Sequence, residues 1–297
     1  MQAERQSSTM SLTSTQVQAL TTTVLGALST TQLRQFSAIE LGYMNTTQIT
    51  NFSTTQINAL STSQVQGLNT TFVSALSTTQ IAGLSSTELN QLASSQLRAI
   101  GTTALQALST TQIGALPADK ISALAGSQVS SLATTILQSL STATLRGLST
   151  AQVKSLTTTA FSVLSTTQIL ALSGTQLFYL SSANFAGLTT TIMSSLDTVQ
   201  LKGLSTTEMI DIATTQLSAV SAGAMPAFLV NQLRYLSTTS IAALTTAQLG
   251  GLTAYQIGGL TAPQVGAIPG GNLFQLSTNQ LAALKPTQIA ALTTTSL

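Results

Sequence analysis

An eight-residue period runs through nearly the whole chain and constrains its fold more than any other feature. Counting in steps of eight from Leu12 to Leu292 gives 36 positions, and every one holds a large apolar residue. No insertion or deletion interrupts the count. Such regularity is typical of a solenoid, which grows by adding similar units. We therefore expect residues 12–297 to form an uninterrupted octapeptide-repeat solenoid, and residues 1–11 an N-terminal arm or cap.

The other positions of the octad follow a consistent pattern when the stepped residue is numbered 1. Position 6 is apolar in every octad, from Val17 to Leu297, and position 8 is usually Ala, Gly or Ser. Position 5 is Gln in 20 of the 36 octads and Glu in three more, whereas position 2 is Ser, Thr, Asn or Asp in 27. Each octad therefore has two apolar core positions, 1 and 6, and two positions, 2 and 5, that are usually polar.

A short helix that restarts in every octad fits this pattern. One continuous helix does not, because eight residues at about 100° each would rotate the apolar stripe by about 80° per repeat. Position 2 supplies an N-cap acceptor and position 5 supplies Gln or Glu three residues later, which is the spacing of a capping box. The small residue at position 8 would allow a neighbouring backbone to approach closely.

Prolines and charges support the helical interpretation. Four of the five prolines lie at positions 2 to 4, where a missing N–H costs little. Acidic residues gather near the expected helix starts and basic residues near the ends, as the helix dipole favours. The acids at positions 2 to 5 are Glu40, Glu88, Asp119, Asp197 and Glu208, and the bases at position 7 are Arg34, Arg98, Arg146, Lys154, Lys202 and Arg234.

The alternative is a β-solenoid, because Thr and Ile favour strands and eight residues are enough for one side of a coil. The abundant Ala, Leu and Gln and the lack of sustained alternation weigh against it. A helix of about six residues is not stable alone in water and must pack against its neighbours. The sequence therefore predicts an all-α fold, a solenoid of very short capped helices.

The composition offers little catalytic or metal-binding chemistry. The chain has no His and no Cys, only 5% charged residues and a net charge of +2. These absences remove the usual metal ligands and the Ser-His and Cys-His nucleophile arrangements, and the few scattered bases do not form a basic stripe for nucleic acid. No apolar run approaches the roughly 20 residues of a membrane span. We expect no enzyme activity, no catalytic residues, no cofactor and no metal.

The pattern resembles octapeptide tracts of bacterial exported and surface proteins. Leu76–Leu84 (Leu-Ser-Thr-Thr-Gln-Ile-Ala-Gly-Leu) and Leu284–Leu292 (Leu-Lys-Pro-Thr-Gln-Ile-Ala-Ala-Leu) show it clearly, and the resemblance covers residues 12–297. It implies a structural role and an extracellular or cell-surface location, and it carries over no catalytic or binding residue. Met1–Met10 holds no apolar signal-peptide core, so we expect either export by a route without such a signal or a sequence that is already mature.

These observations lead to a functional prediction. We expect a non-enzymatic protein that assembles head to tail with itself into a filament, sheath or surface layer. A near-neutral surface gives little charge repulsion, and a core position at Leu297 leaves that end apolar. The alternative is a monomeric binding module that uses its Thr-rich face for ice or a cell-surface glycan. The residues predicted to form the assembly interface are Met1, Met10, Leu12, Val17, Ile289, Leu292 and Leu297.

Overall fold

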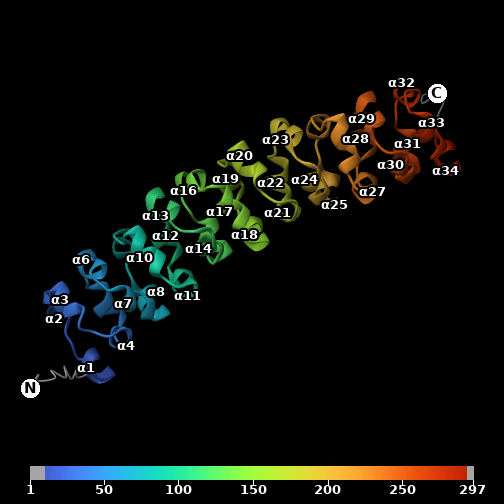
Figure 1. Cartoon of the computed structure of the whole chain (residues 1–297). Helices are drawn as coiled ribbons and strands as arrows, with labels where there is room; N and C mark the ends of the chain where they lie inside the picture. The colour runs from blue at the N-terminus through green and yellow to red at the C-terminus, as the bar shows by residue number, and fades with distance from the viewer. Residues whose placement is uncertain (1–10, 293–297) are drawn as a thin grey trace, which may run out of the picture. The chain divides into compact units, whose positions relative to one another are not determined.

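The computed structural model describes residues 11–292, and this part of the chain is helical throughout. It contains 34 α-helices and one 3₁₀ helix, one for each octad, and no strand. The all-α prediction is confirmed, and the β-solenoid alternative is wrong. The chain divides into two compact units, Met1–Leu140 and Ser141–Leu297. Each unit is described by itself below (Figure 1).

The helices are four to six residues long. In the first unit they are α1 (Ser14–Gln18), α2 (Thr22–Ala27), α3 (Thr30–Leu33), α4 (Ala38–Gly42), α5 (Thr46–Thr50), α6 (Thr54–Asn58), α7 (Thr62–Gly67), α8 (Thr70–Ala75), α9 (Thr78–Ala82), α10 (Ser86–Gln91), α11 (Ser94–Ala99), α12 (Thr102–Gln106), α13 (Thr110–Gly114), α14 (Ala118–Ser122), α15 (Gly126–Ser130) and α16 (Thr134–Ser139).

The second unit continues the series with one helix of a different type. Its elements are α17 (Thr142–Gly147), α18 (Thr150–Ser155), α19 (Thr158–Ser162), α20 (Thr166–Leu170), α21 (Gly174–Phe178), α22 (Ser182–Ala186), α23 (Thr190–Ser195), α24 (Thr198–Gly203), α25 (Thr206–Asp211), α26 (Thr214–Ser218), η1 (Ala222–Ala227), α27 (Val230–Arg234), α28 (Thr238–Ala242), α29 (Thr246–Gly251), α30 (Ala254–Gly259), α31 (Ala262–Gly266), α32 (Gly270–Leu273), α33 (Thr278–Ala282) and α34 (Pro286–Ile289).

The predicted capping box sets where most helices begin. Before α9, the backbone N–H of Ser77 donates to Gln80 Oε1 at 2.8 Å, and the backbone N–H of Gln80 donates to Ser77 Oγ at 3.2 Å. Positions 1 and 2 adopt extended backbone, as at Leu76 (φ −60°, ψ 131°) and Ser77 (φ −68°, ψ 161°). Two extended residues between successive short helices turn the chain, and no described residue requires a positive φ.

The 3₁₀ helix η1 coincides with Pro226, the one proline that lies outside positions 2 to 4. Proline has no N–H to donate to the carbonyl four residues earlier, and its ring crowds that carbonyl. A tighter 3₁₀ turn keeps the octad length without that α-helical bond. Val220 and Met225 remain buried, so the octad keeps its two core positions.

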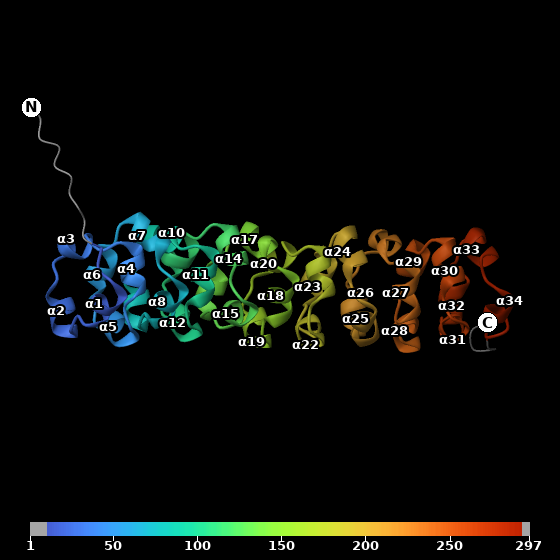
Figure 2. The same ribbon diagram turned by 90° about the horizontal axis from the view of Figure 1, so that it is seen from below.

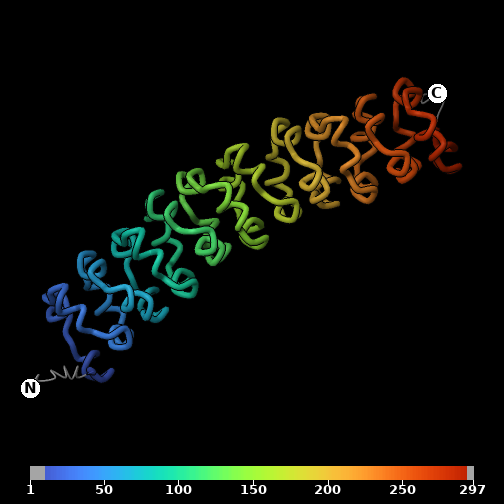
Figure 3. Tube along the Cα trace, viewed as in Figure 1, coloured from blue at the N-terminus to red at the C-terminus, as the bar shows by residue number. Residues whose placement is uncertain are grey.

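The short helices stack as successive coils within each unit (Figure 3). Helices three octads apart pack against each other, as α8 with α11 in the first unit and α21 with α24 in the second. Figure 2 shows α3, α7 and α10 following one another along one edge of the first unit, a step of four helices and then a step of three. One turn of a coil therefore holds between three and four octads.

The core lies between the coils and is built from positions 1 and 6. From Val17 to Leu273 every position-6 side chain is almost inaccessible to solvent. Small residues allow the coils to approach, as predicted for position 8. A Cβ added at Gly203 would lie 2.4 Å from the Cα of Gly174, in the helix three octads earlier. Close packing also accounts for Gly251, Gly258 and Gly259, whereas Gly250 has open space around it.

Candidate functional site: the contact between coils

The position-5 glutamine joins each coil to the preceding one. In addition to its capping bond, Gln80 donates from Nε2 to the carbonyls of Ile49 and Phe52, both at 2.8 Å. These acceptors lie 31 and 28 residues earlier, at positions 6 and 1. Twenty-eight residues correspond to three and a half octads, which agrees with the helix packing. We call this repeated set of bonds the glutamine ladder.

The ladder repeats in both units with nearly constant geometry. In the second unit, Gln264 donates to the carbonyls of Leu233 and Leu236 at 2.8 Å each. The ladder glutamines are buried, except for the half-buried Gln112, and each amide satisfies a position-1 carbonyl that would otherwise be left without a partner. Its donors include the glutamines at positions 48, 56, 64, 80, 96, 112, 128, 176, 200, 216, 232, 248, 256, 264, 280 and 288.

Other donors replace glutamine in some octads. Lys120 donates from Nζ to the carbonyl of Leu92 at 2.6 Å, and the shorter Asn184 donates from Nδ2 to that of Leu156 at 2.9 Å. Both acceptors lie 28 residues earlier, as in the ladder. Asn184 Oδ1 is buried with no partner among the described residues, because the shorter side chain does not also reach its own N-cap.

Arginines at position 7 make a second link between coils. Nε of Arg34 donates to the carbonyl of Ala59 at 2.6 Å, and Nε of Arg98 donates to that of Ala123 at 2.5 Å. Each acceptor lies 25 residues later, at position 8 of the octad three repeats on. These arginines therefore do more than compensate the helix dipole, which was their predicted role.

The pKa values of two glutamates at position 5, one in each unit, are shifted in opposite directions. Burial works to raise the pKa of Glu40, but hydrogen bonds from Ser37 and from the backbone N–H of Leu12 bring that pKa below its ordinary value. Burial raises the pKa of Glu208 to about 7, against smaller opposing effects of bonds from Ser205. Its Oε1 is buried and has no partner in residues 11–292, so the protonated carboxyl is favoured there.

The first coil of the described chain exposes its ladder residues. Gln16 and Gln32 are exposed, although each still makes its own capping bond. Val24, at position 5 between them, is 49% exposed, whereas later apolar residues at this position, such as Phe72 and Ile136, are buried. We call Gln16, Val24 and Gln32 the leading face.

The last coil of the described residues exposes the opposite half of the same contact. Leu281 and Ile289, both at position 6, are 42% and 53% exposed. Leu284 and Leu292, at position 1, are partly exposed. No side-chain amide of the described residues donates to the carbonyls of these four residues. We call Leu281, Leu284, Ile289 and Leu292 the trailing face.

The residues predicted from sequence for an assembly interface lie in different environments. Ile289 and Leu292 are on the trailing face. Leu12 is half-buried and its N–H donates to Glu40 Oε1, and Val17 is fully buried. Met1, Met10 and Leu297 lie outside the described residues. Sequence reasoning missed Gln16, Val24, Gln32 and Leu281, because the exposure of a position-5 or position-6 side chain depends on the number of octads per turn.

The described residues hold neither a cluster of metal ligands nor a membrane-spanning helix. No three acidic side chains in residues 11–292 come together in a way that would hold a metal ion. None of the helices described has both the length and the apolar composition needed to cross a bilayer. The distinctive features of the described chain are therefore the contacts between coils and the exposed surfaces.

Comparisons with known proteins agree with a repeat protein. The ALTTAQ repeat family model matches residues 40–70, 89–126 and 230–262, and residues 243–248 read Ala-Leu-Thr-Thr-Ala-Gln. No curated protein matches. A solved leucine-rich-repeat protein, LegL7 from Legionella pneumophila, is 14% identical over 84% of this chain and 77% of its own, with a TM-score of 0.14, a value too low to carry an argument. This chain is thus a helical repeat protein with three segments similar to the ALTTAQ repeat.

Proposed function

We propose that this chain is a non-enzymatic structural protein that assembles head to tail with further copies of itself. The observation that carries the proposal is the complementarity of the leading and trailing faces. The leading face exposes amide donors and a valine, and the trailing face exposes apolar side chains and backbone carbonyls. These are the two halves of the contact that joins successive coils inside each unit.

The register of the ladder specifies how two copies would meet. If the octad count continues from one copy into the next, Gln32 would donate to the carbonyls of Ile289 and Leu292 of the preceding copy. Val24 would pack against Leu281 by the same count. The contact then repeats the geometry that Gln80 makes with Ile49 and Phe52, and the occupant of each face is one more coil of the same repeat.

A contact of this type joins different surfaces of the two partners, so it propagates unless it closes into a ring. Burial of apolar side chains would drive it, and few charges are involved, so salt should have little effect. The product would be a filament, a sheath or a layer. We place it outside the cell or on its surface, on the basis of the resemblance to exported octapeptide tracts.

Light scattering and sedimentation of the 297-residue chain test this proposal. We expect high-mass assemblies for the parent chain, and their loss when the trailing face carries Leu281→Asp together with Ile289→Asp. Both residues are already exposed, so helical circular dichroism should be retained. The matched control is Val199→Asp, which changes a residue of α24 that is 66% exposed and belongs to neither face, and this variant should assemble like the parent.

Mixing two defective variants tests the polarity of the contact. A leading-face variant, Val24→Asp with Gln32→Glu, should remain monomeric alone, as should the trailing-face variant. Together they retain one intact face of each kind and should form dimers and nothing larger. Long assemblies from the mixture, or a parent chain that stays at 30.5 kDa at high concentration, would rule out head-to-tail docking.

A further inference from the structure

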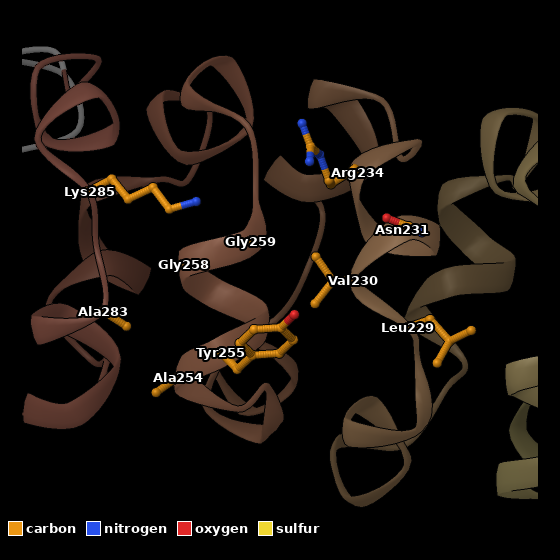
Figure 4. Close-up of a pocket in the computed structure, with 10 residues that line it drawn as sticks. All are labelled: Leu229, Val230, Asn231, Arg234, Ala254, Tyr255, Gly258, Gly259, Ala283 and Lys285. Carbon is orange, nitrogen blue, oxygen red and sulfur yellow. The ribbon is translucent and has the colours of Figure 1, made fainter.

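The second unit carries an open hollow of about 630 Å³ on its surface. That volume is within the ~300–1,000 Å³ range of small-molecule sites. The hollow lies between α27, α30 and the segment that joins α33 to α34 (Figure 4). Its lining residues are Leu229, Val230, Asn231, Arg234, Ala254, Tyr255, Gly258, Gly259, Ala283 and Lys285.

The repeat pattern is broken at this hollow in a way that occurs nowhere else in the described chain. Position 2 holds a capping residue or a small Ala, Gly or Pro in every described octad except two, which have Leu229 and Lys285. Both line the hollow, and neither α27 nor α34 has a side-chain cap. A lost cap weakens a helix, and local rules are most often broken where function requires it.

Two unpaired cations face the hollow. Arg234 and Lys285 extend from opposite sides, with Tyr255 between and below them (Figure 4). Neither cation has an ion pair or side-chain hydrogen bond within residues 11–292, although Arg34 and Arg98, at the same octad position as Arg234, both bond to a carbonyl of the next coil. No acidic residue lines the hollow. Its electrostatic preference is therefore for an anion.

A tyrosine lines this hollow, and a second tyrosine lines a hollow that adjoins it. Tyr255 is 81% exposed, and no other octad has an aromatic residue at position 4. A second hollow of about 480 Å³ shares Asn231 and Arg234 with the first and is also lined by Tyr235, Thr206 and Thr261. The two hollows thus adjoin, with a tyrosine lining each, and we call them together the groove. Gly258 and Gly259 have no side chains and leave backbone at its floor.

We propose that this groove binds an acidic polysaccharide, with a carboxylate-bearing sugar held by Arg234 and Lys285. A guanidinium pairs with a carboxylate through two parallel hydrogen bonds. A tyrosine ring offers an apolar face to the C–H groups of a sugar ring and a hydroxyl to its oxygens, and Asn231 adds amide donors and acceptors. Two adjoining hollows accommodate successive sugars of a polymer. Two cations are too few for the counterion-release binding that nucleic acids show.

Calorimetric titration of the 297-residue chain with tetragalacturonate, a tetramer of a uronic acid, tests the proposal. We expect saturable binding that weakens at least tenfold in Tyr255→Ala and in Arg234→Ala. Lys285→Ser is a stricter test, because serine restores the missing N-cap of α34 while removing a cation. That variant should melt at the same or a higher temperature than the parent and still bind at least tenfold more weakly.

The matched controls are Tyr179→Ala and Lys154→Ala, which change an exposed tyrosine and an exposed lysine of the same unit that line neither hollow. Both should bind like the parent. Absence of binding to tetragalacturonate would overturn the proposal. Equal affinity for the methyl-esterified, neutral tetramer would show that the cations do not select the ligand. Equal affinity for tetraglutamate would assign the groove to acidic peptides instead.

Discussion

Replacing Glu208 with glutamine should stabilise the second unit at neutral pH. Glu208 occupies a ladder position and is only 2% exposed. By the register of the ladder, the carbonyls of Leu177 and Leu180 lie where the amide of a glutamine would donate. An ionised carboxylate has no proton to donate to them, and burial raises the pKa of Glu208 from 4.5 to about 7.

The sign of the pH dependence follows from the raised pKa. Between pH 4.5 and 7 the folded state holds a proton that the unfolded state has released, so stability falls as pH rises through this range. A shift of about 2.5 pKa units corresponds to about 3 kcal/mol at ~1.36 kcal/mol per unit. Stability is fully present below pH 4.5, and the loss is complete slightly above pH 7.

Thermal unfolding followed by circular dichroism at pH 4 and pH 8 measures the effect. At ~2–4 °C per kcal/mol for a unit of about 150 residues, Glu208→Gln should raise Tm by roughly 6–12 °C at pH 8 and change it little at pH 4. The matched control is Glu88→Gln, at the same octad position but half-exposed, which should change Tm little at either pH. An equal effect of Glu208→Gln at both pH values would refute the reasoning.

Three further predictions concern the stacking of coils. Gln80→Leu should destabilise the first unit by about 2–4 kcal/mol, because it removes two hydrogen bonds between coils and leaves the buried carbonyl of Phe52 unpaired. Denaturant unfolding measures this, with the exposed Gln16→Leu as the control. Gly203→Ala should lower Tm, because its Cβ would meet Gly174 at 2.4 Å, whereas Gly250→Ala, with nothing within 4 Å, should not. Deleting Gly147 alone should disrupt folding more than deleting the octad 146–153, because only the octad deletion preserves the core register; circular dichroism of the two variants decides this.

The local structure was predictable from sequence because its causes lie within one octad. The capping box of Ser77 and Gln80 spans four residues, and the need for a small residue at position 8 is visible at Gly203. The second role of the glutamines was not predictable. An eight-residue period does not say how many octads make one turn, and only the turn length brings Gln80 to the carbonyls of Ile49 and Phe52.

The groove was also not predictable from the sequence alone. Leu229 and Lys285 depart from the position-2 rule in the sequence itself, and Tyr255 departs from the usual position-4 residues. These three residues come from octads that are far apart along the chain, and the coil register brings them to one surface hollow. Each departure was visible alone, but their convergence depends on the tertiary structure.

Cross-linking through two introduced cysteines tests the head-to-tail account most directly, because the natural chain has no cysteine. The register places Val24 of one copy against Leu281 of the preceding copy, so a chain with both Val24→Cys and Leu281→Cys should give a ladder of covalent multimers after treatment with a short bismaleimide. An equimolar mixture of the two single variants should give dimers and nothing larger. Dimers from either single variant alone, or no cross-linking of the double variant, would contradict the account.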